Sequence, residues 1–197
     1  MKTISPVINS SSLTLPFPSG CNNTWYTASM AQTAHLNPKL HEWLFDKSSL
    51  TARLSEDTTR FQVQVLREGI AKLAPHEQSF FATDTNMHSR EVILICDGVP
   101  QVYARTLIPE ETLAYADHQL AKLGATSLGA VLFQSPEMTR SDIEATYFNP
   151  DSALHTLSQQ LGQPTQKRLW ARRSIFKLAT HPLMVAEYFL PAATAYK

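Results

Sequence analysis

One pair of apolar segments joined by a tight turn constrains the fold of this chain most. Val92–Cys96 and Val102–Ile108 have the composition of buried strands. Between them stands Asp97-Gly98, a pair that favours the positive backbone angles of a two-residue turn, with Pro100 just beyond it. The segment therefore predicts a β-hairpin, two neighbouring antiparallel strands.

Other segments predict further strands. Leu169–Leu178 and Leu183–Leu190 flank a predicted turn at Thr180-His181-Pro182, which makes a second hairpin. Alternation of apolar and polar residues predicts two more strands, at residues 61–65 and 143–147. Together these segments indicate one antiparallel sheet.

Helical signals are grouped before and between the two hairpins. Asn37-Pro38 is a start signal, because Asn caps a helix and Pro suits its first position. The spacing of apolar residues predicts helices over residues 39–46, 49–54, 110–123, 127–133 and 153–161. We therefore predict an α+β fold, with a single antiparallel sheet of about six strands and the helices on one face.

The N-terminal residues differ in composition from the rest of the chain. Residues 1 to about 27 are rich in Ser, Thr, Asn and Pro and show no sustained periodicity. We expect residues 1–36 to form a flexible or loosely docked extension and residues 37–197 to form one domain.

Charge and hydropathy exclude several classes of protein. Among 197 residues, 17 Lys and Arg balance 17 Asp and Glu, which argues against a nucleic-acid partner. Because no apolar run is long enough to cross a bilayer, we expect no membrane insertion and a cytoplasmic protein, which we take to be a monomer. Cys96 falls in a predicted buried strand, which favours a free thiol over a disulfide with Cys21.

Motifs for metals, nucleotides and serine hydrolysis are missing from the sequence. The seven histidines show no His-Glu-x-x-His spacing, and no Gly-x-Ser-x-Gly motif occurs. With six glycines in all, no phosphate-binding glycine loop can be identified. We therefore expect neither a metal nor an organic cofactor.

Charged residues within apolar strands are the remaining candidates for chemistry. Glu187 and Arg90 lie in strands whose same-face neighbours are apolar, and Arg105 lies between two apolar neighbours in the first hairpin. A buried carboxylate of this kind must be paired, protonated or functional. Glu187 can pair with Arg172 or Arg173 across the second hairpin, and the two other arginines can reach solvent at strand ends. The same groups also suit a small, rigid anionic ligand.

Short motifs follow one another in order from about residue 37 to residue 193. They are Trp43-Leu44, Ser49-Leu50-Thr51, Val65-Leu66-Arg67-Glu68-Gly69, Arg90-Glu91-Val92, Cys96-Asp97-Gly98, Arg105-Thr106, Leu123-Gly124, Leu128-Gly129, Leu132-Phe133, Leu169-Trp170, Arg172-Arg173-Ser174, Pro182-Leu183 and Glu187 through Pro191-Ala192. Each motif is weak alone. The ordered set resembles the chorismate pyruvate-lyase family, which makes 4-hydroxybenzoate for ubiquinone.

The resemblance implies a fold and a set of site residues. The family fold is a six-stranded antiparallel sheet with helices on one face and a buried site under two helical flaps. Arg90 stands at the position that grips the ring carboxylate, and Glu187 at the position that meets the ring hydroxyl. Leu50 and Leu128 stand at the two apolar flap positions; Leu50 replaces a residue that is usually Met and has a similar volume.

The implied substrate, chorismate, carries two carboxylates, and its products are pyruvate and 4-hydroxybenzoate. Arg105 is our candidate for binding the second, enolpyruvyl carboxylate. Two other functions stay open: a lyase that makes a different hydroxybenzoate isomer, and a module of the same fold that binds a small molecule without chemistry. Regulators with such a module carry a basic domain ahead of it, and the residues before 37 here are not basic, so we expect an enzyme.

Overall fold

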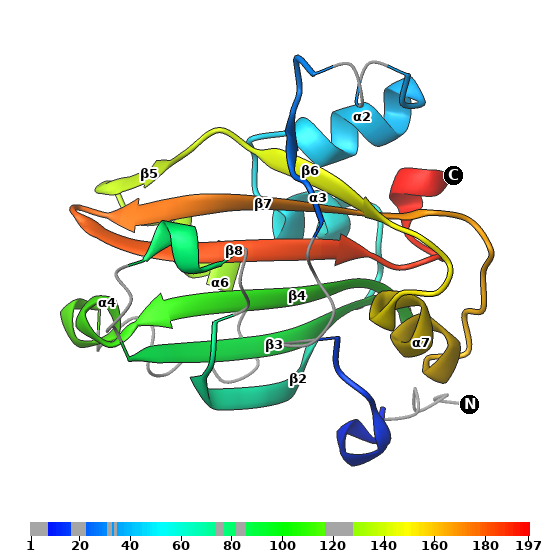
Figure 1. The fold of residues 1–197 in the computed structure, drawn as a ribbon, viewed down its shortest axis with the longest axis horizontal. Helices are drawn as coiled ribbons and strands as arrows, with labels where there is room; N and C mark the ends of the chain where they lie inside the picture. Colours follow the sequence, from blue (N-terminus) through cyan, green and yellow to red (C-terminus); the bar gives the residue numbers. More distant parts are fainter. Residues whose placement is uncertain are drawn as a thin grey trace.

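The fold is built on one antiparallel sheet (Figure 1). The computed structural model describes residues 8–16, 23–30, 33, 35–73, 77–81, 86–116 and 128–197. Within these residues eight strands lie in the order β1-β6-β7-β8-β4-β3-β2, and β5 pairs with β7 beyond the end of β6. The strands are β1 (Tyr26–Thr27), β2 (Phe61–Ala71), β3 (Met87–Cys96), β4 (Val99–Pro109), β5 (Met138–Arg140), β6 (Glu144–Phe148), β7 (Leu169–Leu178) and β8 (His181–Phe189).

The helices are short, and local capping sets where the first two begin. Asn37 accepts a hydrogen bond from the Lys39 backbone N–H at 2.9 Å, and Ser49 Oγ accepts one from the Ala52 N–H at 3.3 Å. The described helices are α2 (Pro38–Phe45), α3 (Leu50–Glu56), α4 (Glu110–Tyr115), α6 (Leu128–Leu132) and α7 (Ala153–Gln160), with 3-10 turns at Ser10–Ser12, Gln78–Phe80 and Thr194–Tyr196.

The structure confirms the α+β class and the first hairpin. The sheet is larger than the predicted six or so strands, because β1 and β5 are too short, at two and three residues, to leave a periodic signal. Of the helix predicted over residues 110–123, α4 is described, and residues 117–127 lie outside the described part. The predicted helix over 153–161 is confirmed as α7.

The second hairpin turns earlier than predicted. Its turn is Ala179-Thr180, with Ala179 at a φ of 53°, and His181 already pairs with Leu178. Pro182 is therefore inside β8 rather than in the turn. A proline is tolerated there because β4 pairs with β8 only from Met184 onward, so no neighbouring strand needs an N–H from residue 182.

The register of the first hairpin assigns side chains to the two faces of the sheet. Asp97 and Gly98 have φ values of 48° and 81°, as a two-residue turn between antiparallel strands requires. The register shifts by one residue between Leu94 and Ile95, and beyond this bulge Arg90 pairs with Thr106 and Glu91 with Arg105. We call the face that bears Arg90, Val92 and Leu94 the site face, and the face that bears Glu91, Ile93 and Ile95 the second face.

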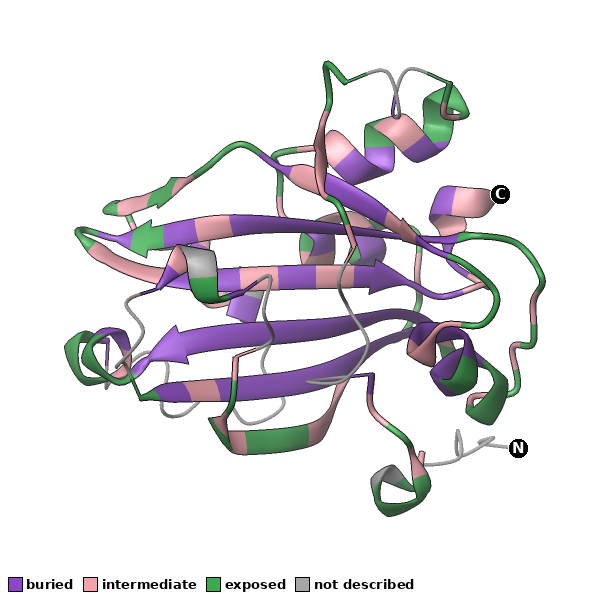
Figure 2. Ribbon diagram, viewed as in Figure 1, coloured by how far each residue is buried: buried purple, intermediate pink, exposed green. Residues whose placement is uncertain are grey.

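Helices cover both faces. The helices α2, α3 and α6 pack on the site face, as predicted, and α3 and α6 are seen behind the sheet in Figure 1. Helix α7 packs on the second face instead, where Leu154 and Leu157 join the cluster around Ile93 and Tyr188. Figure 2 shows that β3, β4, β7 and β8 are buried along most of their length, whereas β2 is half-buried along most of its length and exposed at Arg67, Glu68 and Ile70.

The described part of residues 1–36 contacts the sheet. Strand β1 pairs with β6, and the Ile8 N–H donates to Gln64 Oε1 at 3.2 Å. The Thr14 N–H donates to Gln160 Oε1 at 2.9 Å. Leu13, Leu15 and Trp25 pack against the core of the second face. In the part of the chain that is described, no helix has the length and apolar character needed to cross a membrane.

A buried cluster of charges lies on the second face. Arg105 Nη1 is 2.7 Å from Glu91 Oε1, and Arg105 Nε is 3.1 Å from Glu77 Oε1. Tyr103 donates its hydroxyl to Glu91 Oε2 at 2.7 Å. Burial, with the Glu91 charge beside it, raises the pKa of Tyr103 well above its ordinary value, so the hydroxyl stays a donor. Arg105 is therefore the centre of a structural network.

This network predicts a large loss of stability when Arg105 is removed. Arg105→Ala leaves the buried carboxylates of Glu77 and Glu91 without this partner, although Glu91 keeps an ion pair with Arg67. We therefore expect the free energy of unfolding to fall by about 3–5 kcal/mol. Urea unfolding followed by circular dichroism measures the loss. Arg60→Ala, at an exposed position, is the control and should change the free energy by about 0.5 kcal/mol or less. A loss for Arg105→Ala as small as that of the control would contradict the structural role.

Candidate active site

A pocket opens on the site face, between the sheet and the helices α3 and α6. About 590 Å³ of space lies between its lining atoms, with the open solvent at the mouth included. Leu50 of α3 and Leu128 of α6 cover it, and Val92, Ala104 and Val185 line it from the strands. Most of the lining is therefore apolar.

Four charged side chains line this apolar pocket: Arg90, Arg140, Arg172 and Glu187. Three guanidinium groups against one carboxylate leave two positive charges in excess among the described lining residues. Charge interactions are stronger in such surroundings than in water. The lining therefore favours a ligand with two negative charges and at least one further polar group.

Arg90 reaches the pocket from the β3 strand. Its side chain is 4 % exposed, and Nη1 lies 3.1 Å from Glu68 Oε2 of the neighbouring strand β2. The Glu68 side chain is 52 % exposed, so this partner can turn to solvent when a ligand arrives. Arg90 therefore combines a buried position with a counter-ion that is easily displaced.

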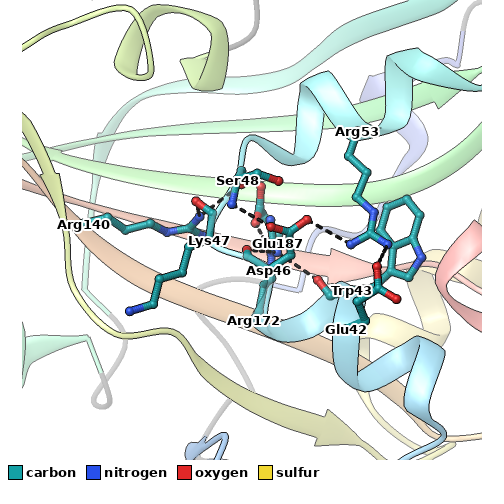
Figure 3. Close-up of polar contacts among 9 residues, drawn as sticks. All are labelled: Glu42, Trp43, Asp46, Lys47, Ser48, Arg53, Arg140, Arg172 and Glu187. Carbon is teal, nitrogen blue, oxygen red and sulfur yellow. Dashed lines mark hydrogen bonds and ion pairs between the residues drawn. The ribbon is translucent and has the colours of Figure 1, made fainter.

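Glu187 is held by Arg172 on the adjacent strand (Figure 3). The two residues pair in the β7–β8 register, and Arg172 Nε lies 2.6 Å from Glu187 Oε2. Arg172 Nη1 also donates to the carbonyl oxygens of Trp43 and Asp46, at 2.9 and 3.0 Å. Of the two partners that the sequence left open, Arg172 is the one found, and Arg173 pairs with Glu144. Arg172 thus orients the pocket carboxylate and ties the end of α2 to the sheet.

Arg140 enters the pocket from β5, which pairs with β7 along the edge opposite to β8. Its Nε donates to Ser174 Oγ at 2.9 Å, and its Nη1 donates to the carbonyl oxygens of Lys47 and Ser48 at 3.0 and 3.3 Å. Its guanidinium carbon lies 4.8 Å from the centre of the Phe176 ring. Burial lowers the pKa of Arg140 to about 10, despite the nearby Glu187 charge. These contacts hold the guanidinium in one orientation.

The loop between α2 and α3 is fastened by Asp46. Its Oδ1 accepts from the Ser48 N–H at 2.8 Å, and its Oδ2 lies 3.0 Å from Arg53 Nη1. Arg53 also pairs with Glu42 and lies over the Trp43 ring, 3.9 Å from its centre (Figure 3). Because Leu50 follows this loop directly, these contacts set the position of one side of the pocket cover.

The structure does not bring Arg105 to this pocket, and the assignment of the second carboxylate to Arg105 is corrected. Arg105 pairs with Glu91 in the strand register and so lies on the second face, bound to Glu77 and Glu91. The other predicted site residues, Arg90, Glu187, Leu50 and Leu128, all line the one pocket.

Sequence reasoning missed Arg140 as a pocket residue and considered Arg172 only as an ion-pair partner. Arg172 lies two residues from Trp170 in an apolar strand, so the alternation that singled out Glu187 applies to it equally. Arg140 belongs to a three-residue strand and has no comparable signal.

The surroundings of Asp46 predict a pH-dependent contribution to stability. Burial raises the pKa of Asp46, but hydrogen bonds from Ser48 and the Arg53 guanidinium outweigh burial and hold the pKa below its ordinary value. A carboxyl whose pKa is lowered by folding stabilises the fold above its unfolded pKa, and this contribution is lost as the pH falls through the folded pKa. Asp46→Asn should therefore lower the free energy of unfolding by about 1–2 kcal/mol at pH 7.

The difference between the wild type and Asp46→Asn should stay constant above about pH 5 and shrink below about pH 4. Urea unfolding between pH 3 and pH 7 measures it. A difference that grows toward low pH would show that the Asp46 charge is not stabilising.

Comparison with known proteins identifies relatives over most of the chain. A family model for chorismate lyase matches residues 20–197. The chain is 39 % identical over 183 residues to a probable chorismate pyruvate-lyase of Pseudoalteromonas translucida (strain TAC 125), which covers 92 % of this chain and 99 % of the relative. It is 39 % identical over 182 residues to a protein of the same name from Shewanella amazonensis (strain ATCC BAA-1098 / SB2B), with 92 % and 95 % covered.

Solved structures share the fold at much lower identity. The effector domain of PhnF from Mycobacterium smegmatis matches with a TM-score of 0.51 and 13 % identity, over 73 % of this chain and 88 % of that domain. A possible transcriptional regulator, YydK from Bacillus subtilis, matches with a TM-score of 0.51 and 11 % identity, over 72 % and 62 %. These two likenesses concern the fold alone. The family match and the close relatives show that this chain belongs to the chorismate lyase family, a family of carbon–oxygen lyases.

Proposed function

We propose that this protein removes pyruvate from chorismate and releases 4-hydroxybenzoate for ubiquinone biosynthesis in the cytoplasm. The observation that carries the proposal is the pocket lining, where three arginines and one glutamate meet under an apolar cover. Chorismate is a dianion with a ring hydroxyl, so its charge and polarity match this lining.

The reaction needs little chemistry from the protein, because the product ring is aromatic. A proton leaves ring C4, and its electron pair forms the C3–C4 double bond while the C3–O bond breaks. The enolpyruvyl group takes the bond electrons and gains a proton at its methylene carbon, which gives pyruvate. The pocket must therefore hold one substrate conformer, neutralise two carboxylates and keep a polar group at C4.

Arg90 and Glu187 suit the two ends of the ring. They lie on the same face, two strands and two residues apart, so their backbones are separated by about 12 Å. A six-membered ring fits between side chains that extend toward each other over this distance. Arg90 offers a planar fork to the ring carboxylate, and Glu187, held by Arg172, accepts a hydrogen bond from the C4 hydroxyl.

The cover explains how water is kept from the reacting atoms. Leu50 and Leu128 come from two separate helices and are 4 % and 8 % exposed. Opening either helix admits substrate, and closing both surrounds it with apolar side chains. This arrangement supports a site that binds a hydroxybenzoate tightly and releases it slowly.

The first experiment mixes the purified protein with chorismate and measures pyruvate and the aromatic products in parallel. We expect pyruvate and 4-hydroxybenzoate in equal amounts. A different hydroxybenzoate isomer would establish the sister reaction instead. Tight binding of a hydroxybenzoate without turnover would assign the protein to the non-catalytic class.

Removal of Arg90 should abolish most of this activity without unfolding the protein. Loss of a buried charge contact costs about 2–5 kcal/mol, so kcat/KM for Arg90→Ala should fall by about 30- to 5,000-fold. The exposed Arg60→Ala is the control and should keep the wild-type rate. Near-normal turnover by a folded Arg90→Ala protein would remove Arg90 from the site.

A further inference from the structure

The three pocket arginines differ in what neutralises them. Arg172 pairs with Glu187, and Arg90 pairs with Glu68. Arg140 contacts only neutral oxygens, those of Ser174, Lys47 and Ser48, and no carboxylate of the described residues lies within ion-pair distance of it. Arg140 is thus the one pocket arginine whose charge has no counter-ion in the described part of the protein.

The guanidinium of Arg140 is also prepared to receive an anion. Its Nε and Nη1 are taken by the protein, whereas Nη2 has no hydrogen-bond partner among the described residues. Ser174 and the Phe176 ring hold the guanidinium plane in place. Burial lowers the pKa of Arg140 to about 10, which reports the free-energy cost of an unneutralised cation here. A carboxylate at Nη2 would relieve this cost.

The position of Arg140 relative to Arg90 suits a ligand with two separated carboxylates. Arg90, Thr106, Val185 and Ser174 form one row across strands β3, β4, β8 and β7. The row spans three strand spacings, or about 14 Å. Arg90 extends over the row from one end, and Arg140 is anchored on Ser174 at the other end. The space between them lies beside Glu187.

We propose that Arg140 binds the enolpyruvyl carboxylate of the substrate, while Arg90 binds the ring carboxylate. This assignment rests on the proposed function and takes the place of the one made for Arg105. It also connects the substrate to the pocket cover, because Arg140 holds the carbonyl groups of Lys47 and Ser48 in the loop before Leu50. Arg140 therefore distinguishes chorismate, with two carboxylates, from 4-hydroxybenzoate, with one.

The test compares how one substitution affects these two ligands. In Arg140→Gln, kcat/KM for chorismate should fall by about 100-fold, with a raised KM. The Kd for 4-hydroxybenzoate, measured by calorimetry, should change by less than about threefold, because this ligand lacks the second carboxylate. Arg140→Lys keeps the charge without the planar fork and should recover part of the chorismate activity.

Arg168→Gln is the matched control, because Arg168 lies over the Tyr147 ring, 4.3 Å from its centre, and is exposed outside the pocket. It should leave both constants unchanged. Equal weakening of both ligands in Arg140→Gln would show that Arg140 only fastens the loop, and would overturn the assignment. A wild-type protein without chorismate turnover would instead overturn the proposed function, whatever Arg140 does. If Arg140→Gln fails to fold, kcat/KM for chorismate and the Kd for 4-hydroxybenzoate are compared in Arg140→Lys instead.

Discussion

The register of the β3–β4 hairpin is the constraint on which the rest of the site depends. The two-residue turn at Asp97-Gly98 pairs Cys96 with Val99, and a one-residue shift of the register between Leu94 and Ile95 then pairs Arg90 with Thr106 rather than with Arg105. That pairing sends Arg90 toward α3 and α6 and sends Arg105 toward Glu77 and Glu91 on the second face. Two arginines that look alike in the sequence thereby take different roles: one lines a pocket, and the other neutralises a buried network.

The Arg172–Glu187 contact joins the sheet, the helices and the pocket. A carboxylate among apolar side chains would be unstable alone, and Arg172 stabilises it while donating to the last carbonyl groups of α2. The loop that begins there continues through Asp46 to Leu50, and Arg140 holds it from the other side. Pocket charge and pocket cover are therefore parts of one hydrogen-bonded structure.

Much of this was predictable from the sequence, and what was missed has physical reasons. Alternation and turn signals predicted the α+β class, and same-face neighbours singled out Arg90 and Glu187. The Arg105 assignment failed because the register of the hairpin shifts by one residue between Leu94 and Ile95. An unshifted hairpin would pair Arg90 with Arg105 on one face, whereas the bulge pairs Glu91 with Arg105 and leaves no clear signal in the sequence. Arg140 left no signal, because a three-residue strand is too short for periodicity and its contacts are with residues more than 30 positions away.

The sheet is a single layer in which neighbouring residues of one strand serve opposite sides. In β4, Ala104 lines the pocket and Arg105 belongs to the charged network. Single substitutions can reshape the pocket without touching that network, whereas a further inserted residue that no bulge absorbs would exchange the two environments along the strand, as the shift beside Gln101 already shows. During divergence, the pocket positions of β4 can vary independently of the network positions, whereas a change in the length of β4 has to be absorbed by a bulge or at the strand ends.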